Sequence, residues 1–158
     1  MFAVCAVFAV LGASCVQIVF TREIVAFTAG YDGNRQAQNN ERLVLNKVLF
    51  NQGGGYNSNT GIFTAPVGGI YQFQIHGLTE KNSSFWIKLY HNDEYVISAF
   101  ARQSGDYDSA GNSVFVGVRR YDTLNLRTVG RAGFYGESND IYTTWSGHRI
   151  GPLCSEYD

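Results

Sequence analysis

Two acidic side chains lie close together in a polar, glycine-containing segment, residues 103–112. Asp106 and Asp108 stand on either side of Tyr107. Carboxylate oxygens are the ligands that calcium prefers in proteins, so this pair predicts a calcium site. A complete site needs more oxygen ligands than the pair supplies, and the alternative is the solvated end of a β-hairpin.

A second segment, residues 129–139, places aromatic and charged side chains between glycines. It contains Arg131, Phe134, Tyr135 and Glu137. Aromatic rings stack on apolar faces of sugars and proteins, while polar groups fix the orientation of the ligand. We predict that these four residues bind a carbohydrate or a protein surface. The alternative is that Phe134 or Tyr135 folds back and caps the core.

The remaining reactive residues favour modification over catalysis. Asn82-Ser83-Ser84 is an acceptor sequence for N-glycosylation, provided that the chain is secreted. The three histidines, at positions 76, 91 and 148, are dispersed, with no nucleophile or carboxylate in evident register. The sequence therefore predicts that the protein is not an enzyme and needs no cofactor, with calcium as the one candidate ion.

The N-terminal residues resemble a secretory signal peptide. Residues 2–13 form an unbroken apolar run, too short to cross a bilayer, which takes roughly 20 residues. We assign residues 1–15 to the signal, with cleavage between 13 and 17, and predict no membrane insertion. The alternative is a buried N-terminal strand.

Cysteine usage is compatible with secretion. If Cys15 and Cys154 both stay in the mature chain, they could join to each other or to another protomer in an oxidising compartment. If only Cys154 remains, it is an unpaired thiol that could link protomers.

The composition predicts one all-β domain. The chain has 18 glycines, 11 phenylalanines and 10 tyrosines but only 2 prolines, which is typical of many strands joined by tight turns. Charged residues make up 16%, which is low for a helical protein. The net charge of −1 gives no electrostatic basis for binding nucleic acid.

Short strand patterns follow one another along residues 24–150. In residues 69–78, Tyr71, Phe73 and Ile75 recur at every second position, as one buried face of a strand requires. Asn92-Asp93 predicts the turn of a hairpin. Residues 34–42 are polar and predict a surface loop. The expected strands are 24–28, 44–50, 61–65, 69–78, 84–91, 94–102, 113–119, 123–128 and 141–150.

Residues 45–75 resemble the signature of the C1q globular-head family, which is related in fold to tumour necrosis factor. Six signature positions fall in register: Asn51, Tyr56, Phe63, Gly69, Tyr71 and Phe73. Leu45 and Ile75 replace the usual aromatic residues but keep an apolar side chain. Residues 142–147 are similar to the closing strand of the family, with Trp145 for the common Phe. We interpret the six signature residues as structural.

The resemblance implies a ten-strand jelly-roll sandwich that forms trimers and has no catalytic residues. It implies one globular domain over residues 16–158, with its core in 24–150. No collagen-like triplets occur, so a head-only member without a stalk is expected. Members of the family bind other molecules through loops and outer surfaces, sometimes with calcium.

By this analogy, the predicted function is a secreted trimeric recognition protein that binds microbial glycans in innate immunity. Two alternatives stay open. The chain could be a trimeric signalling ligand for a cell-surface receptor, or a structural component of an extracellular matrix.

Overall fold

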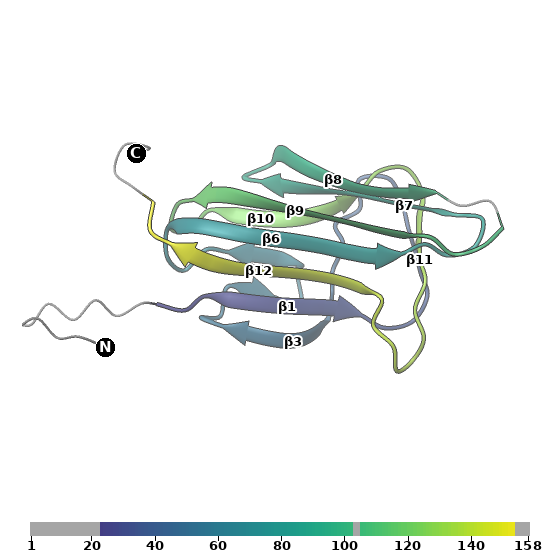
Figure 1. Cartoon of the computed structure of the whole chain (residues 1–158), viewed down its shortest axis with the longest axis horizontal. Helices are drawn as coiled ribbons and strands as arrows, with labels where there is room; N and C mark the ends of the chain where they lie inside the picture. Colours follow the sequence, from purple (N-terminus) through teal and green to yellow (C-terminus); the bar gives the residue numbers. More distant parts are fainter. Residues whose placement is uncertain (1–22, 103–104, 154–158) are drawn as a thin grey trace, which may run out of the picture.

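The computed structural model describes residues 23–102 and 105–153. In these ranges the regular secondary structure consists of β-strands (Figure 1). No helix in them is long and apolar enough to cross a membrane. The strands are β1 (Ala26–Tyr31), β2 (Arg35–Ala37), β3 (Lys47–Gln52), β4 (Tyr56–Asn57), β5 (Ile62–Thr64), β6 (Gly69–Leu78), β7 (Ser84–His91), β8 (Glu94–Arg102), β9 (Ser109–Val118), β10 (Thr123–Thr128), β11 (Ala132–Phe134) and β12 (Thr143–Gly151).

Ten of these strands form a sandwich of two five-stranded sheets. The first sheet has the order β3-β1-β12-β6-β9 and the second the order β4-β5-β10-β7-β8. All the pairs are antiparallel, and sequence neighbours often lie in different sheets. The predicted ten-strand jelly roll is confirmed, and β11 and β2 add a small third sheet.

The strands with clear alternation were predicted with their observed bounds. Residues 69–78, 84–91, 94–102 and 123–128 match β6, β7, β8 and β10. The β7–β8 hairpin turns at Asn92 and Asp93, whose φ angles are 47° and 68°. Two positive φ values in a two-residue turn match the right-handed twist of the flanking strands.

The prediction of an irregular loop over residues 34–42 is wrong in part. Arg35–Ala37 forms β2 and pairs with β11, which lies inside the segment 129–139 that was also expected to be irregular. Ala37, Ala132 and Phe134 are buried. Strands of three residues are too short to show a period of two, and their partner lies about a hundred residues away, so local pattern gives no signal.

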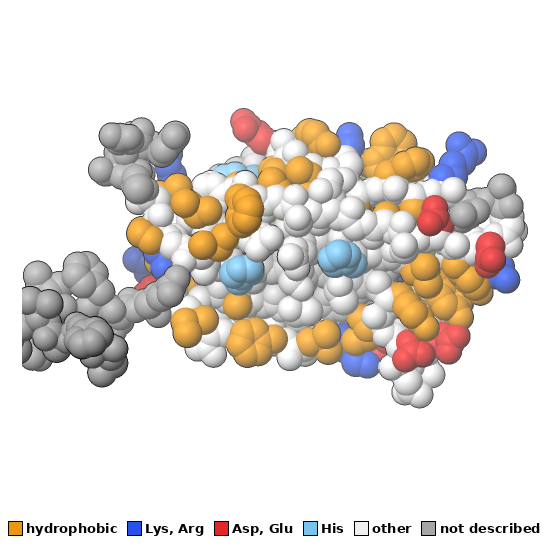
Figure 2. Space-filling model, viewed as in Figure 1, with side chains coloured by type: hydrophobic (Ala, Val, Ile, Leu, Met, Phe, Trp, Pro, Cys, Tyr) orange, Lys and Arg blue, Asp and Glu red, His pale blue; other side chains and the backbone are white. Residues whose placement is uncertain are grey.

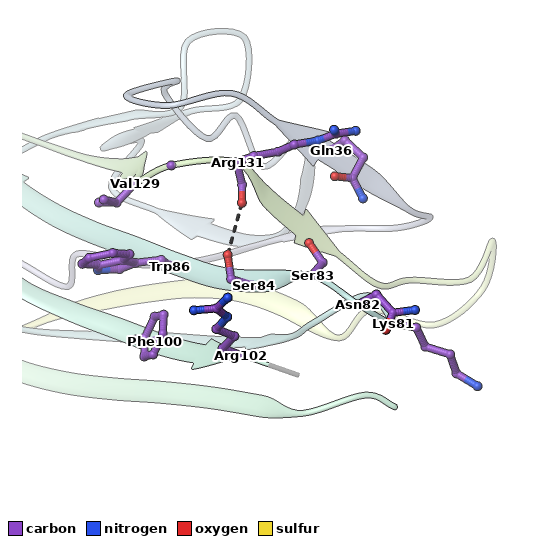
Figure 3. Close-up of a pocket in the computed structure, with 11 residues that line it drawn as sticks. Gln36, Lys81, Asn82, Ser83, Ser84, Trp86, Phe100, Arg102, Val129 and Arg131 are labelled. Atoms are coloured by element: carbon purple, nitrogen blue, oxygen red, sulfur yellow. Dashed lines mark hydrogen bonds between the residues drawn. The ribbon is translucent and has the colours of Figure 1, made fainter. Parts of the chain in front are cut away.

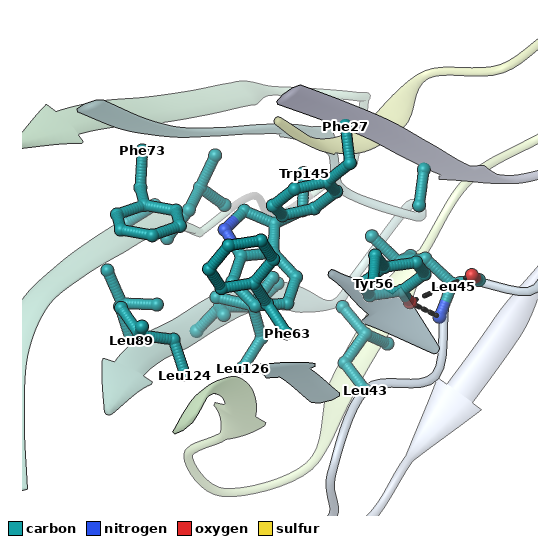
Figure 4. Packing of buried hydrophobic residues seen from close by; sticks show 14 of the residues in the cluster. Phe27, Leu43, Leu45, Tyr56, Phe63, Phe73, Leu89, Leu124, Leu126 and Trp145 are labelled. Carbon is teal, nitrogen blue, oxygen red and sulfur yellow. Dashed lines mark hydrogen bonds between the residues drawn. The ribbon is translucent and has the colours of Figure 1, made fainter. Parts of the chain in front are cut away.

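Aromatic side chains from both sheets fill the core (Figure 4). Phe27 lies 5.0 Å from Tyr56 and 5.0 Å from Trp145 between ring centroids, and Phe63 lies 5.6 Å from Phe73. All five rings are buried. Offset and edge-to-face contacts of this kind add to the free energy of burial, at about 0.5–1.5 kcal/mol per pair.

The signature polar groups bond to the chain around this core. The Asn51 side chain donates to the Tyr56 carbonyl at 2.9 Å and accepts from the Tyr56 amide at 3.2 Å. The Tyr56 hydroxyl donates to the Leu45 carbonyl at 2.9 Å, and burial raises the pKa of Tyr56 to about 12. The Asn51 amide thereby fixes the chain on both sides of the glycine turn at residues 53–55.

Gly69 is required for close approach of two backbones. Its φ does not lie in the left-handed region, so the requirement is one of space and not of backbone conformation. A Cβ at this position would stand 2.4 Å from the Gly151 carbonyl oxygen on the neighbouring strand β12. Any side chain would therefore separate β6 from β12.

Candidate functional site

The two segments that were predicted to bind ligands meet at one end of the sandwich. Tyr107, from the turn between β8 and β9, lies 4.3 Å from Tyr135 between ring centroids, and Tyr135 lies 5.6 Å from Tyr142. We call these three residues the tyrosine cluster. The Lys81 ammonium lies 4.8 Å from the centre of the Tyr107 ring. Half-exposed tyrosines beside a cation suit contact with a protein or carbohydrate surface.

Neighbouring carboxylates raise the pKa of Tyr135 and of Tyr142 and keep their hydroxyls protonated. The Tyr135 hydroxyl donates to the Glu137 carboxylate, and this hydrogen bond raises the pKa of Tyr135. The charge of Asp140 raises the pKa of Tyr142. These two tyrosines therefore present neutral hydroxyl groups at physiological pH and offer hydrogen bonds, not nucleophiles.

The four residues predicted in segment 129–139 do not form one surface. Tyr135 belongs to the tyrosine cluster, and Glu137 accepts a hydrogen bond from its hydroxyl. Arg131 is exposed to solvent. Phe134 is 1% exposed and packs edge-to-face on Phe85 at 5.4 Å, so it is unavailable to a ligand and the prediction is corrected at this position. Phe134 follows the alternative, in which a ring folds back onto the core. β11 pairs with β2, and this pairing directs the side chains of Ala132 and Phe134 inward.

The carboxylates of Asp106 and Asp108 accept hydrogen bonds from backbone amides. Asp106 accepts from the Tyr107 amide and Asp108 from the Ser109 amide, each at 2.9 Å. The backbone of Asp108 bonds to Thr79 through its amide and its carbonyl. Among the residues described, no group of three or more His, Cys, Asp or Glu side chains could hold a metal ion. The calcium site stays a prediction.

The glycosylation sequon lies in the turn between β6 and β7. Asn82 is exposed and has a φ of 57°, a left-handed conformation that Asn tolerates well. An exposed turn is accessible to the modifying enzyme, and occupancy of the sequon stays a prediction. The signal segment, Cys15 and Cys154 lie outside the described residues.

The outer face of the first sheet is nearly uncharged (Figure 2). Its central rows follow from the strand register, in which Thr28 pairs with Phe50 and Ser146, and Gln74 pairs with Ser146 and Ser113. We call this surface the neutral face. Its outward side chains include Thr28, Phe50, Gln72, Gln74, His76, Ser113, Phe115, Ser146 and His148.

Large apolar side chains are exposed on the neutral face. Phe50 is 53% and Phe115 63% exposed, on the two edge strands of the sheet. Figure 2 shows Lys, Arg, Asp and Glu at the margins of the face and few of them within it. A surface with exposed rings and few charges resembles the core of a protein–protein interface.

Sequence reasoning missed the neutral face and two members of the tyrosine cluster. The alternation of Tyr71, Phe73 and Ile75 leaves Ile70, Gln72, Gln74 and His76 on the opposite face of β6, and their common lack of charge was the available signal. Nothing local connects Tyr107 with Tyr135 and Tyr142, because the loops that carry them meet only in the fold. His91 bonds to Asp122 at 2.8 Å at the other end of the sandwich, apart from both surfaces.

The family model of the C1q domain matches residues 26–150 of this chain. Human complement C1q tumor necrosis factor-related protein 2 is 35% identical over 104 residues, which cover 65% of this chain and 34% of that protein. Mouse complement C1q tumor necrosis factor-related protein 6 is 28% identical over 129 residues, covering 79% of this chain and 49% of that protein. The chain thus spans between a third and a half of the length of these curated relatives.

Solved structures share the fold at low sequence identity. The globular domain of zebrafish complement 1qA aligns with a TM-score of 0.68 at 17% identity, over 82% of this chain and 99% of that domain. The Eiger tumour necrosis factor of S. frugiperda aligns with a TM-score of 0.69 at 10% identity, over 85% of this chain and 97% of that structure. At these identities the likeness concerns the jelly roll alone.

Proposed function

This chain belongs to the C1q domain family, and from that premise we propose that it is a secreted protein that assembles as a trimer and binds another macromolecule without catalysing a reaction. The neutral face carries this proposal. Burying two exposed phenylalanine rings in a protein interface is favourable, and a surface with few charges limits the desolvation penalty of ionised groups. The same surface would be a liability in a protein that stayed monomeric.

The tyrosine cluster is the proposed contact surface for a ligand. It lies at the end of the sandwich where the loops gather, so assembly through the neutral face leaves its rings accessible. Tyrosine supplies a rigid apolar ring and a hydroxyl at a low cost in conformational entropy. We assign to it the recognition of extracellular surface ligands such as microbial glycans, as part of innate immunity.

A second candidate function is that of a signalling ligand for a cell-surface receptor. The curated relatives with the printed name "tumor necrosis factor-related" favour it. A trimer that presents the tyrosine cluster three times could bind three receptor chains with the same surface. A glycan ligand and a protein receptor are therefore separated by the binding partner, not by the assembly.

Assembly is tested with a matched pair of substitutions. Phe115→Glu places a carboxylate on the neutral face, and we expect it to convert a trimer into a monomer in size-exclusion chromatography with light scattering. Phe100, 55% exposed on β8 in the other sheet, provides the control, and Phe100→Glu should remain trimeric. A wild-type protein that is monomeric at micromolar concentration contradicts the proposal, as does a trimeric Phe115→Glu variant.

Ligand binding is tested on the intact trimer with polysaccharides, whole bacteria and animal cells. We expect saturable binding to a subset of polysaccharides, with a loss of at least tenfold in affinity for Tyr107→Ala combined with Tyr135→Ala. Tyr121→Ala, which removes a 67% exposed tyrosine elsewhere, is the control. Protease-sensitive binding to animal cells, with no polysaccharide bound, would instead favour the signalling ligand.

A further inference from the structure

An open groove of about 760 Å³ lies on the second sheet, beside the turn that carries Asn82 (Figure 3). Two aromatic side chains form its floor. Trp86 on β7 pairs with Phe100 on β8, with 5.2 Å between ring centroids and an angle of 69° between the rings. They are 38% and 55% exposed. Two large rings left open to solvent in one depression offer a platform for a flat apolar group.

The wall of the groove is attached to this floor by hydrogen bonds. The Val129 amide donates to the Trp86 carbonyl at 2.9 Å, and the Ser84 hydroxyl donates to the Arg131 carbonyl at 3.1 Å. The Gly130 amide donates to the Asn39 side chain at 2.8 Å. The wall is therefore held in place before any ligand arrives, which lowers the entropic cost of binding.

The groove is positively charged. Within the described residues, Arg102 and Arg131 line it without an ion pair, and none of its lining residues is acidic. Lys81 lies at the rim, with its ammonium over the Tyr107 ring. Glu80, outside the lining, accepts a hydrogen bond from Gln36. Figure 3 shows Arg102 beside the two rings and Arg131 on the opposite wall.

We infer that this groove binds an acidic sugar, one that carries a carboxylate or a sulfate. The apolar face of a sugar ring stacks on Trp86 and Phe100, while its anionic group accepts hydrogen bonds from the guanidinium of Arg102 or Arg131. Arginine donates in a planar fork that fits carboxylate and sulfate oxygens. The uncharged side chains of Gln36 and Ser83 suit hydrogen bonds with sugar hydroxyls. The inference rests on the proposed binding function and adds to the tyrosine cluster a second site, for which it names the ligand class.

The test compares two polymers with the same backbone. Dextran sulfate and neutral dextran differ only in the anionic group, and inorganic polyphosphate provides anions without sugar rings. All proteins carry Asn82→Gly, which removes any N-glycan at the rim and accommodates the φ of 57°. We expect binding to dextran sulfate, none to dextran, and weaker binding to polyphosphate.

Two kinds of variant test the arginines and the aromatic floor of the groove separately. Arg102→Gln with Arg131→Gln, and separately Trp86→Ala, should each weaken the binding of dextran sulfate at least tenfold. Arg42→Gln with Arg120→Gln removes two exposed arginines elsewhere and should change affinity less than twofold. Light scattering on each variant must still show the wild-type oligomer.

Other outcomes overturn the assignment. Equal binding by the Arg102/Arg131 variant places the anion elsewhere, and polyphosphate binding that is as tight and indifferent to Trp86→Ala indicates a simple anion patch. Preferential binding to phosphatidylserine vesicles indicates a lipid surface. A trimer that binds neutral glycans but not dextran sulfate refutes this inference and leaves the proposed function standing, whereas a monomer refutes the proposed function.

Discussion

The two outer faces of the sandwich differ in charge although they cover the same core. The neutral face of the first sheet presents Thr, Ser, Gln and His side chains with exposed phenylalanines at its edges. The second sheet presents cations over aromatic rings, with Lys88 5.1 Å from the centre of the Tyr95 ring and Arg127 4.8 Å from that of Tyr90. Core packing constrains only the inward positions of a strand, so the outward positions were free to diverge.

This difference separates self-association from ligand binding. A surface that is buried between protomers must lose its water, which is costly for charged groups and favourable for aromatic rings. A surface that captures an anion from solvent needs charges that remain accessible. In this molecule the two requirements are met by different sheets. A substitution can therefore abolish self-association without affecting ligand binding, or the reverse.

The largest effect is expected from a charge at the centre of the neutral face. Ser146 lies on the middle strand β12, where its hydroxyl is 3.0 Å from that of Thr28. Ser146→Glu would bury a carboxylate in each copy of the proposed interface, and we expect the association constant of the trimer to fall at least a hundredfold. Analytical ultracentrifugation over a dilution series measures this directly.

Ser98→Glu is the matched control on the other sheet. Ser98 lies opposite Lys88 in the register of β7 and β8, so a carboxylate there gains a cation as its neighbour. The variant should remain as trimeric as the wild type. If both variants dissociate, or neither does, the assignment of assembly to the neutral face is wrong.

Raising the ionic strength should weaken the binding of dextran sulfate about tenfold and leave the oligomer intact. Contacts between arginine and an anionic sugar are screened by salt, because the Debye length falls from about 10 Å at 0.1 M to about 3 Å at 1 M. Binding of dextran sulfate should therefore weaken at least tenfold between 0.05 and 0.5 M NaCl, while the oligomer stays intact. Titration calorimetry and light scattering on one sample series measure the two quantities. Salt-independent binding would point to apolar contacts alone.

How far the sequence predicts this molecule depends on whether a contact is local. The alternation of Tyr71, Phe73 and Ile75 predicted β6 with its observed bounds, because burial of one face acts on every second residue. The pairing of β2 with β11 had no such signal. The contact of Tyr107 with Tyr135 likewise depends on where two separate loops end in the fold.

The groove shows how a small irregularity defeats sequence reasoning. Counting back from the Asn92-Asp93 turn places Trp86 opposite Ala99. A register shift between Leu89 and Tyr90 moves the pairing by one residue, so that Trp86 faces Phe100. Since side chains alternate between faces, this single shift creates the exposed aromatic pair. No residue type in the hairpin marks the position of the shift.

A smaller effect is expected from Glu41, which supports the wall of the groove. Its carboxylate accepts from the Gln38 amide at 2.8 Å and from Arg35 at 2.6 Å. The Gln38 amide, and after it Arg35, hold the pKa of Glu41 below its usual value. The segment continues into hydrogen bonds between Glu41 and Thr128, directly before the wall.

A carboxylate with a lowered pKa in the folded state adds stability above its unfolded pKa of about 4.3, and that contribution is lost as the pH falls through the folded value. Solvent screens this half-exposed pair, so Glu41→Gln should cost about 0.5–1 kcal/mol at pH 7. The difference from wild type should be smaller at pH 3 than at pH 7. Urea unfolding at both pH values, at one protein concentration, tests this. Glu94→Gln on the exposed β7–β8 hairpin should show no difference at either pH.

The smallest effect is expected in the shared core, at Trp145. Its ring is fully buried against Phe27 and Phe73, and among the described residues its Nε1 has no hydrogen-bond partner. Leaving a buried N–H unsatisfied costs about 1–3 kcal/mol. Trp145→Phe removes that group but also loses buried apolar atoms and leaves a void, at a cost of the same order. The two terms oppose each other, so the free energy of unfolding should change by less than about 1 kcal/mol. Because the substitution touches neither outer face, the oligomer and the affinity for dextran sulfate should both be unchanged. A loss of either would mean that core packing controls the faces, and that they are not independent surfaces on a common scaffold.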